Sequence, residues 1–165
     1  MTGPFRELEL PGVFLARVER HEDARGWLVE TFRTDWLEAA GLAPARPQMA
    51  YVSLTRPGVV RGPHAHSEQT DLFAFIGPSD FKVFLWDNRA GSAVFGRRLT
   101  LVLGETAPGL LLVPPGVVHA YRNVGRIDGL VMNYPNRLFA GPGRAGPVDE
   151  IRYEDRPDSG FRLED

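Results

Sequence analysis

The sequence predicts an all-β fold, built as a barrel of two packed antiparallel sheets with one short helix near the N-terminus. Short segments rich in Val, Ile, Leu and Phe recur between Gly and Pro residues, as expected of such a fold. Residues 81–87 are apolar on both faces, which places this strand between two layers. The 165 residues fit one domain, with a core over about 12–135 and a loop-rich tail over 136–165.

The predicted elements follow from the turn residues that bound each apolar run. Ten strands are expected, at residues 13–19, 27–32, 51–55, 59–64, 72–76, 81–87, 98–103, 109–113, 118–122 and 129–134. Thr34 is expected to cap a helix over 35–40, with Glu38 near the capping-box position and Gly41 as its end. The large aromatic side chains are expected in the core. They are Trp27, Phe32, Phe73, Phe75, Phe81, Phe84, Trp86 and Phe95.

Composition excludes several classes of function. The formal net charge is -2 and both signs are spread along the chain, so no nucleic-acid or membrane-surface partner is expected. No apolar run is long enough for a membrane helix, and the first residues do not resemble a signal peptide. The sequence has no cysteine, so a metal would have to bind to His, Asp or Glu. We therefore expect a cytoplasmic protein with a small-molecule partner.

Three histidines form the strongest chemical signal. His64 and His66 are two residues apart on one predicted strand, so their side chains point to the same face. The turn at Pro115-Gly116 leads into the strand that carries His119, which can bring a third imidazole to that face. Asp71, or failing it Glu68, can add a carboxylate, and such a set suits a divalent transition metal. His21 lies in a polar turn and is assigned no role.

These residues carry two resemblances. Residues 58–71 and 114–123 resemble the two cupin signature motifs, so the barrel is expected to be a cupin-type jelly roll. Five stretches along most of the chain are similar to the dTDP-4-dehydrorhamnose 3,5-epimerase family. They are 23–26 (DARG) with Glu30, 58–64 (GVVRGPH), 84–89 (FLWDNR), 92–96 (SAVFG) and 113–119 (VPPGVVH).

The second resemblance implies an enzyme that acts, without a cofactor, on a dTDP-linked 4-keto-6-deoxy sugar in deoxysugar or polysaccharide precursor biosynthesis. It also implies a homodimer. By resemblance, His64 is the base that removes a proton next to the ketone, and Arg61 and His119 polarise the keto group. Arg61 is expected to share a strand face with His64 only if no bulge lies between them. The expected substrate-binding residues are Arg25, Glu30, His66, Tyr121 and Phe139.

The chain also departs from the family pattern. The family's lysine has no counterpart in the stretch from Glu68 to Asp71, and Met132 stands where its proton-donating tyrosine is expected. Met49 and Tyr51 replace a Gln-x-Asn pair, and His66 is an additional histidine. Two alternatives therefore remain open. One is a metal-dependent cupin, an oxygenase or isomerase, with His64, His66, Asp71 and His119 as ligands of one divalent transition metal; the other is a non-catalytic cupin that binds sugar nucleotides.

Overall fold

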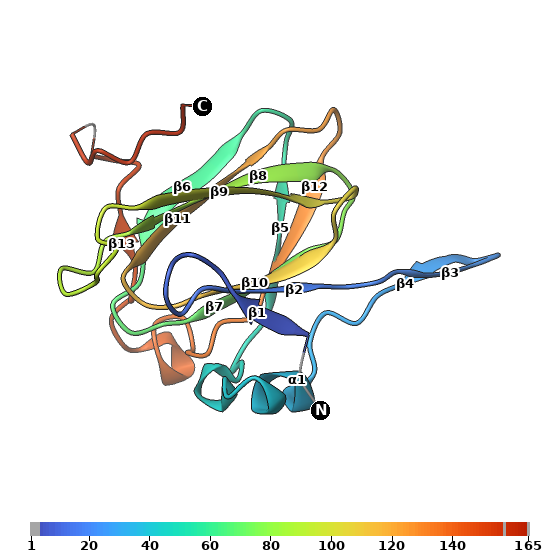
Figure 1. Ribbon diagram of the computed structural model, residues 1–165, viewed down its shortest axis with the longest axis horizontal. Helices are drawn as coiled ribbons and strands as arrows, with labels where there is room; N and C mark the ends of the chain where they lie inside the picture. Colours follow the sequence, from blue (N-terminus) through green and yellow to red (C-terminus); the bar gives the residue numbers. More distant parts are fainter. Residues whose placement is uncertain (1–3, 157, 165) are drawn as a thin grey trace.

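The computed structural model describes residues 4–156 and 158–164 and consists mainly of two facing antiparallel sheets (Figure 1). The six-stranded sheet has the order β1 (Phe5–Glu7), β2 (Phe14–Arg17), β10 (Gly109–Val113), β7 (Asp71–Phe75), β12 (Gly129–Asn133) and β5 (Tyr51–Thr55). The five-stranded sheet has the order β13 (Ile151–Arg152), β6 (Val60–Ala65), β11 (Val117–Asn123), β8 (Asp80–Asp87) and β9 (Arg98–Gly104). The predicted all-β fold with one short α-helix is confirmed.

Strand β8 shows how the two layers are filled. Phe81 and Leu85 lie in the core between the sheets, whereas Phe84 and Trp86 point to the outer face. There the tail covers them: the Phe161 ring lies 5.5 Å from the Trp86 ring, centroid to centroid. The prediction that both faces of this strand are covered is confirmed, and the tail contributes an edge strand, β13, besides its loops.

The N-terminal region differs from the prediction. Residues expected to form a polar turn form a strand, β3 (His21–Asp23), which pairs with the shorter-than-expected β4 (Gly26–Leu28). This β3–β4 hairpin projects from the barrel (Figure 1), so Trp27 is 43% exposed and its predicted core position is wrong. Phe95, 60% exposed in a turn, is a second wrong core assignment. Strand β1 was not predicted.

The helix α1 (Thr34–Ala39) begins one residue earlier than expected. Arg33 occupies the N-cap position and no side chain caps the helix, so the predicted Thr34 cap is wrong. Glu38 forms an ion pair with Arg46 at 3.1 Å instead of reaching back to the helix start. Gly41 ends the helix with a φ of +72°, as predicted. Two 3-10 turns, η1 (Ala43–Ala45) and η2 (Pro142–Arg144), complete the elements of the described residues.

Candidate active site

A β-bulge in β6 places two of the expected site residues on one face. His64 pairs with His119 and Arg61 pairs with Tyr121, so three steps on β6 match two on β11. Gly62, inside the bulge, has a φ of +81°, and a Cβ there would lie 2.6 Å from the His119 carbonyl oxygen. The expectation that the two residues share a face only without a bulge is wrong, because residues three apart on a regular strand point to opposite faces. The extra residue of the bulge brings Arg61 to the inner side with His64, and both line the same cavity.

This cavity has a volume of about 1410 Å³ and lies between β5, β6 and the chain that follows β12. Tyr51 and Ser53 contribute from β5, Arg61 and His64 from β6, and Phe139 from the tail. The wall therefore combines aromatic rings with cationic, hydroxyl and imidazole groups. Such a concave surface with a few convergent polar groups is typical of a small-molecule site.

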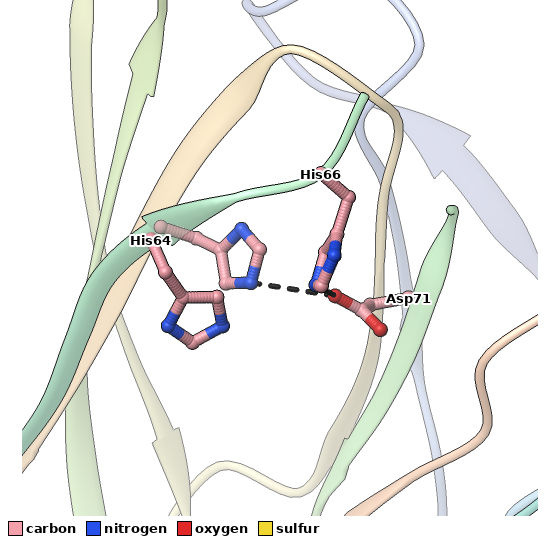
Figure 2. Close-up of side chains that lie close together, drawn as sticks. His64, His66 and Asp71 are labelled. Atoms are coloured by element: carbon pink, nitrogen blue, oxygen red, sulfur yellow. Dashed lines mark ion pairs between the residues drawn. The ribbon is translucent and has the colours of Figure 1, made fainter. Parts of the chain in front are cut away.

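Four side chains converge at the inner end of the cavity. The rings of His64 and His119 are 4.3 Å apart, and those of His64 and His66 are 5.7 Å apart, centroid to centroid. Asp71 is buried on β7 and faces them from the other sheet, as Figure 2 shows for His64, His66 and Asp71. The Oδ2 atom of Asp71 lies 3.1 Å from Nε2 of His66 and 3.4 Å from Nε2 of His119. The sequence-predicted cluster is assembled in the structure.

The electrostatics of this cluster follow from burial and from the single carboxylate. Burial by itself would raise the pKa of Asp71, but the imidazoles of His119 and His66 outweigh it and hold that pKa below its usual range. Burial opposes protonation of His66, yet the contact with Asp71 raises its pKa overall. Burial and the neighbouring rings of His119 and His66 lower the pKa of His64 to about 2. At neutral pH His64 is therefore an uncharged imidazole.

Three further residues orient the cluster. Gln69 and Asn133 donate to Oδ1 of Asp71 at 2.9 and 2.8 Å, so Oδ2 is the oxygen presented to the histidines. The carbonyl oxygen of Asp149 contacts Nδ1 of His66. The Asp149 carboxylate accepts the backbone N–H groups of Ser67, Glu68 and Gln69 at 2.8 to 2.9 Å. The tail thus fixes the loop that carries His66, a role that sequence reasoning missed.

A model of the dTDP-4-dehydrorhamnose 3,5-epimerase family matches residues 7–134, which include both strands that carry the histidines. The chain belongs to this family. The predicted family, and with it the prediction of an enzyme of the nucleotide-sugar epimerase class, is confirmed.

Curated relatives and a solved structure agree with the membership. A probable low-salt glycan biosynthesis epimerase from Haloferax volcanii is 38% identical over 118 residues, 71% of this chain and 72% of that protein. The spore coat polysaccharide biosynthesis protein SpsL from Bacillus subtilis is 36% identical, over 70% of this chain and 73% of that protein. The structure of a dTDP sugar isomerase from Desulfovibrio desulfuricans G20 superimposes with a TM-score of 0.77 at 25% identity, covering 94% of this chain and 91% of that chain.

The epimerase family's expected proton donor has no counterpart at the position predicted for it. Met132 and Tyr134 pack on the outer side of the six-stranded sheet, in an apolar cluster that includes Leu37 of the helix, and the Tyr134 hydroxyl contacts Thr31 at 2.6 Å. Between them, Asn133 points to the inner side, and its amide donates to the Tyr51 hydroxyl at 2.8 Å. Tyr51 is therefore a phenol that lines the cavity from the sheet opposite His64.

The remaining predicted site residues lie at different depths. His66, Tyr121 and Phe139 line the cavity, although Tyr121 is only 5% exposed and its ring packs among core phenylalanines. His119 is 3% exposed and does not line the cavity, so it contacts the His64 ring from behind. This depth does not support the expected direct contact between His119 and a keto group.

Arg25 and Glu30 lie outside this cavity. The Arg25 side chain is 90% exposed on the hairpin and pairs with Asp23 at 2.6 Å, and Glu30 pairs with Arg33 at 3.0 Å. Neither residue lines the cavity of its own chain. Among the residues that the structure describes, no helix is long and apolar enough to cross a membrane.

Proposed function

We propose that this chain is a nucleotide-sugar epimerase or isomerase that acts on a dTDP-linked 4-keto-6-deoxy sugar through proton transfers between side chains and substrate, without a cofactor in these steps. The observation that carries the proposal is the bulge at Gly62, which sets an imidazole and a guanidinium, His64 and Arg61, on one wall of the cavity. A base beside a cation is the arrangement needed to remove a proton next to a ketone and to stabilise the resulting enolate.

In this mechanism His64 accepts the proton from the carbon beside the ketone, and Arg61 faces the oxygen on which negative charge develops. Two N–H groups of Arg61 are already directed to Thr55 and to the Leu54 carbonyl, at 2.9 and 2.8 Å. These bonds hold the guanidinium against β5 and leave its other donors for a ligand, because a guanidinium has five.

Epimerisation requires that a proton return to the opposite face of the carbon, and we assign this step to Tyr51. It lines the cavity from the six-stranded sheet, whereas His64 belongs to the five-stranded sheet, so the two residues approach a bound sugar from different walls. The bond from Asn133 fixes the position of its hydroxyl. Partial burial raises the pKa of Tyr51 to about 12, so the phenol carries its proton at neutral pH.

The outer cavity has groups suited to the nucleotide. Phe139 is 50% exposed and offers a ring for stacking on a base. Arg144 and Arg152 line the same cavity and can bind the diphosphate, since guanidinium groups match phosphate oxygens in geometry and charge. The names of the relatives from Haloferax volcanii and Bacillus subtilis, which refer to glycan and to polysaccharide biosynthesis, support a place in the synthesis of polysaccharide precursors.

A homodimer is part of the proposal. The hairpin β3–β4 extends away from its own barrel and exposes Trp27 and Leu28, at 43% and 63%. A second copy would cover these apolar side chains and would give Arg25 and Glu30 a site that their own chain does not offer. The cytoplasmic location stays a prediction.

The test is solvent exchange in deuterium oxide with a dTDP-linked 4-keto-6-deoxy sugar. Wild-type protein should incorporate deuterium next to the ketone, and His64→Ala should lose this exchange by ~100-fold or more. A thermal melt and a binding titration of each protein show whether fold and affinity are retained. Exchange at the wild-type rate in His64→Ala would remove His64 as the base. Binding without any exchange by the wild-type protein would identify a non-catalytic binding protein instead.

A further inference from the structure

Two buried polar atoms in the histidine cluster face each other at a distance of 3.4 Å. Within the described part of the chain, Oδ2 of Asp71 and Nε2 of His119 make no well-directed hydrogen bond, although the two residues are 1% and 3% exposed. A buried polar atom without a partner costs about 1–3 kcal/mol, and such atoms are rare in folded proteins. Their convergence on one point makes this space suitable for a cation.

The tautomers of the His66 and His119 rings support the same conclusion. Nδ1 of His119 lies 3.1 Å from the Val117 carbonyl oxygen, and Nδ1 of His66 contacts the Asp149 carbonyl oxygen. A carbonyl oxygen only accepts hydrogen bonds, so both Nδ1 atoms carry the hydrogen, and in the neutral rings both Nε2 atoms present lone pairs. These lone pairs and the Asp71 carboxylate are directed toward the same space, and a cation between them would satisfy all three groups.

The separations match those between ligands of one ion. With metal–ligand bonds of about 2.1 Å, two ligands lie ~3.0 Å apart at a right angle and ~3.4 Å apart at the tetrahedral angle. The distances from Asp71 Oδ2 to the Nε2 atoms of His66 and His119 are 3.1 and 3.4 Å. The donor atoms of all four residues, His64 included, lie within 4.8 Å of one another.

The groups behind the cluster also resemble the surroundings of a metal site. Ligating histidines characteristically donate their other ring nitrogen to a carbonyl or carboxylate, and ligating carboxylates are themselves hydrogen-bonded. His66 and His119 meet the first condition, and Gln69 and Asn133 provide the second for Asp71. The Gln69 amide also lies 3.2 Å from Nε2 of His66, a contact that an ion bound to this nitrogen would replace.

We propose that His66, Asp71 and His119 bind one divalent transition-metal ion of the Zn²⁺, Mn²⁺ or Ni²⁺ class. Two imidazoles and one carboxylate suit these ions, and the alkaline-earth cations prefer sites made only of oxygen. His64 lines the cavity, whereas Asp71 and His119 do not, so we assign His64 to the substrate and leave it outside the ligand set. This site goes beyond the proposed proton transfers, which do not require it.

The experiment measures metal content in protein without an affinity tag. Wild-type protein is stripped with a chelator, incubated separately with Zn²⁺, Mn²⁺ and Ni²⁺, desalted and analysed by elemental mass spectrometry, with a thermal melt of each sample. We expect one ion per chain and a higher melting temperature for the loaded form. His66→Gln and Asp71→Asn should bind the ion ~10-fold or more weakly. His21→Gln, which changes the exposed histidine of the hairpin, is the matched control and should bind like the wild type.

The results separate the metal site from the proposed function. Absence of any retained ion in the wild type, or equal retention in the wild type and in both cluster variants, would overturn the metal site and leave the cluster as a protonated network. His64→Ala should keep the ion; its loss there would overturn the assignment of His64 outside the ligand set. Metal retention is measured without substrate, so a chain that binds the ion but does not exchange deuterium contradicts only the epimerase proposal.

Discussion

The bulge at Gly62 can be tested by one added methyl group. Gly62→Ala places a Cβ 2.6 Å from the His119 carbonyl oxygen, where ordinary contacts begin at 3.4 Å, so the two strands must separate by several tenths of an ångström. The backbone also has a φ of +81°, which costs an L-residue about 1–2 kcal/mol. Forced overpacking adds ~1–3 kcal/mol. The free energy of unfolding should therefore fall by ~2–5 kcal/mol.

Gly58→Ala is the matched control, because Gly58 also precedes the histidines and has a φ of +76°, but a Cβ there meets nothing within 4 Å. This control should lose only the conformational part, about 1–2 kcal/mol. In thermal melts 1 kcal/mol corresponds to ~2–4 °C for a chain of this size, so Gly62→Ala should melt ~2–12 °C below Gly58→Ala. It should also lose exchange activity, because Arg61 and His64 move relative to each other. Equal melting temperatures would refute the close approach of β6 and β11.

Two further predictions concern the proton donor and the hairpin. Tyr51→Phe should keep deuterium exchange next to the ketone but slow inversion at that carbon by ~10-fold or more. The control is Tyr153→Phe, which removes a tail hydroxyl that accepts a hydrogen bond from Asn88, and it should change neither rate. Equal inversion rates in the two variants would exclude Tyr51. The wild type should sediment as a dimer and Trp27→Asp as a monomer, while the same change at Val124, 47% exposed in a loop, should leave the dimer intact. A monomeric wild type would contradict the role of the hairpin.

The strands were predictable wherever one face is buried. Residues 81–87 gave a correct strand because alternate side chains fill two apolar layers. The hairpin was missed because every residue of β3 and β4 is exposed, so burial imposes no pattern on its sequence. Trp27 shows the same limit: an aromatic side chain is core only if the backbone turns it inward, and here it lies under the Arg20 guanidinium on the hairpin.

The sequence predicted those parts of the site in which the spacing of two residues along a strand decides the face to which their side chains point. His64 and His66 are two residues apart, and both line the cavity although His66 lies one residue past the end of β6, so this part of the cluster followed from sequence. Arg61 required a bulge, which depends on how closely Gly62 approaches the partner strand. Asp149 gave no local signal, because its carboxylate binds backbone N–H groups some 80 residues earlier in the chain. The inward position of Tyr51 depends in the same way on a contact with Asn133.

The contact between Asp149 and the loop of His66 has a consequence for the order in which the protein matures. Asp149 lies 83 residues after His66, so at ordinary synthesis rates it leaves the ribosome roughly 4 to 17 s later. The strands through β12 can pair before that time, whereas the loop of His66 is held only after the tail has docked. The strands through β12 can therefore form before the active site is complete. A chain that ends before Asp149 would lack both this restraint on the loop and the cover that the tail gives Phe84 and Trp86.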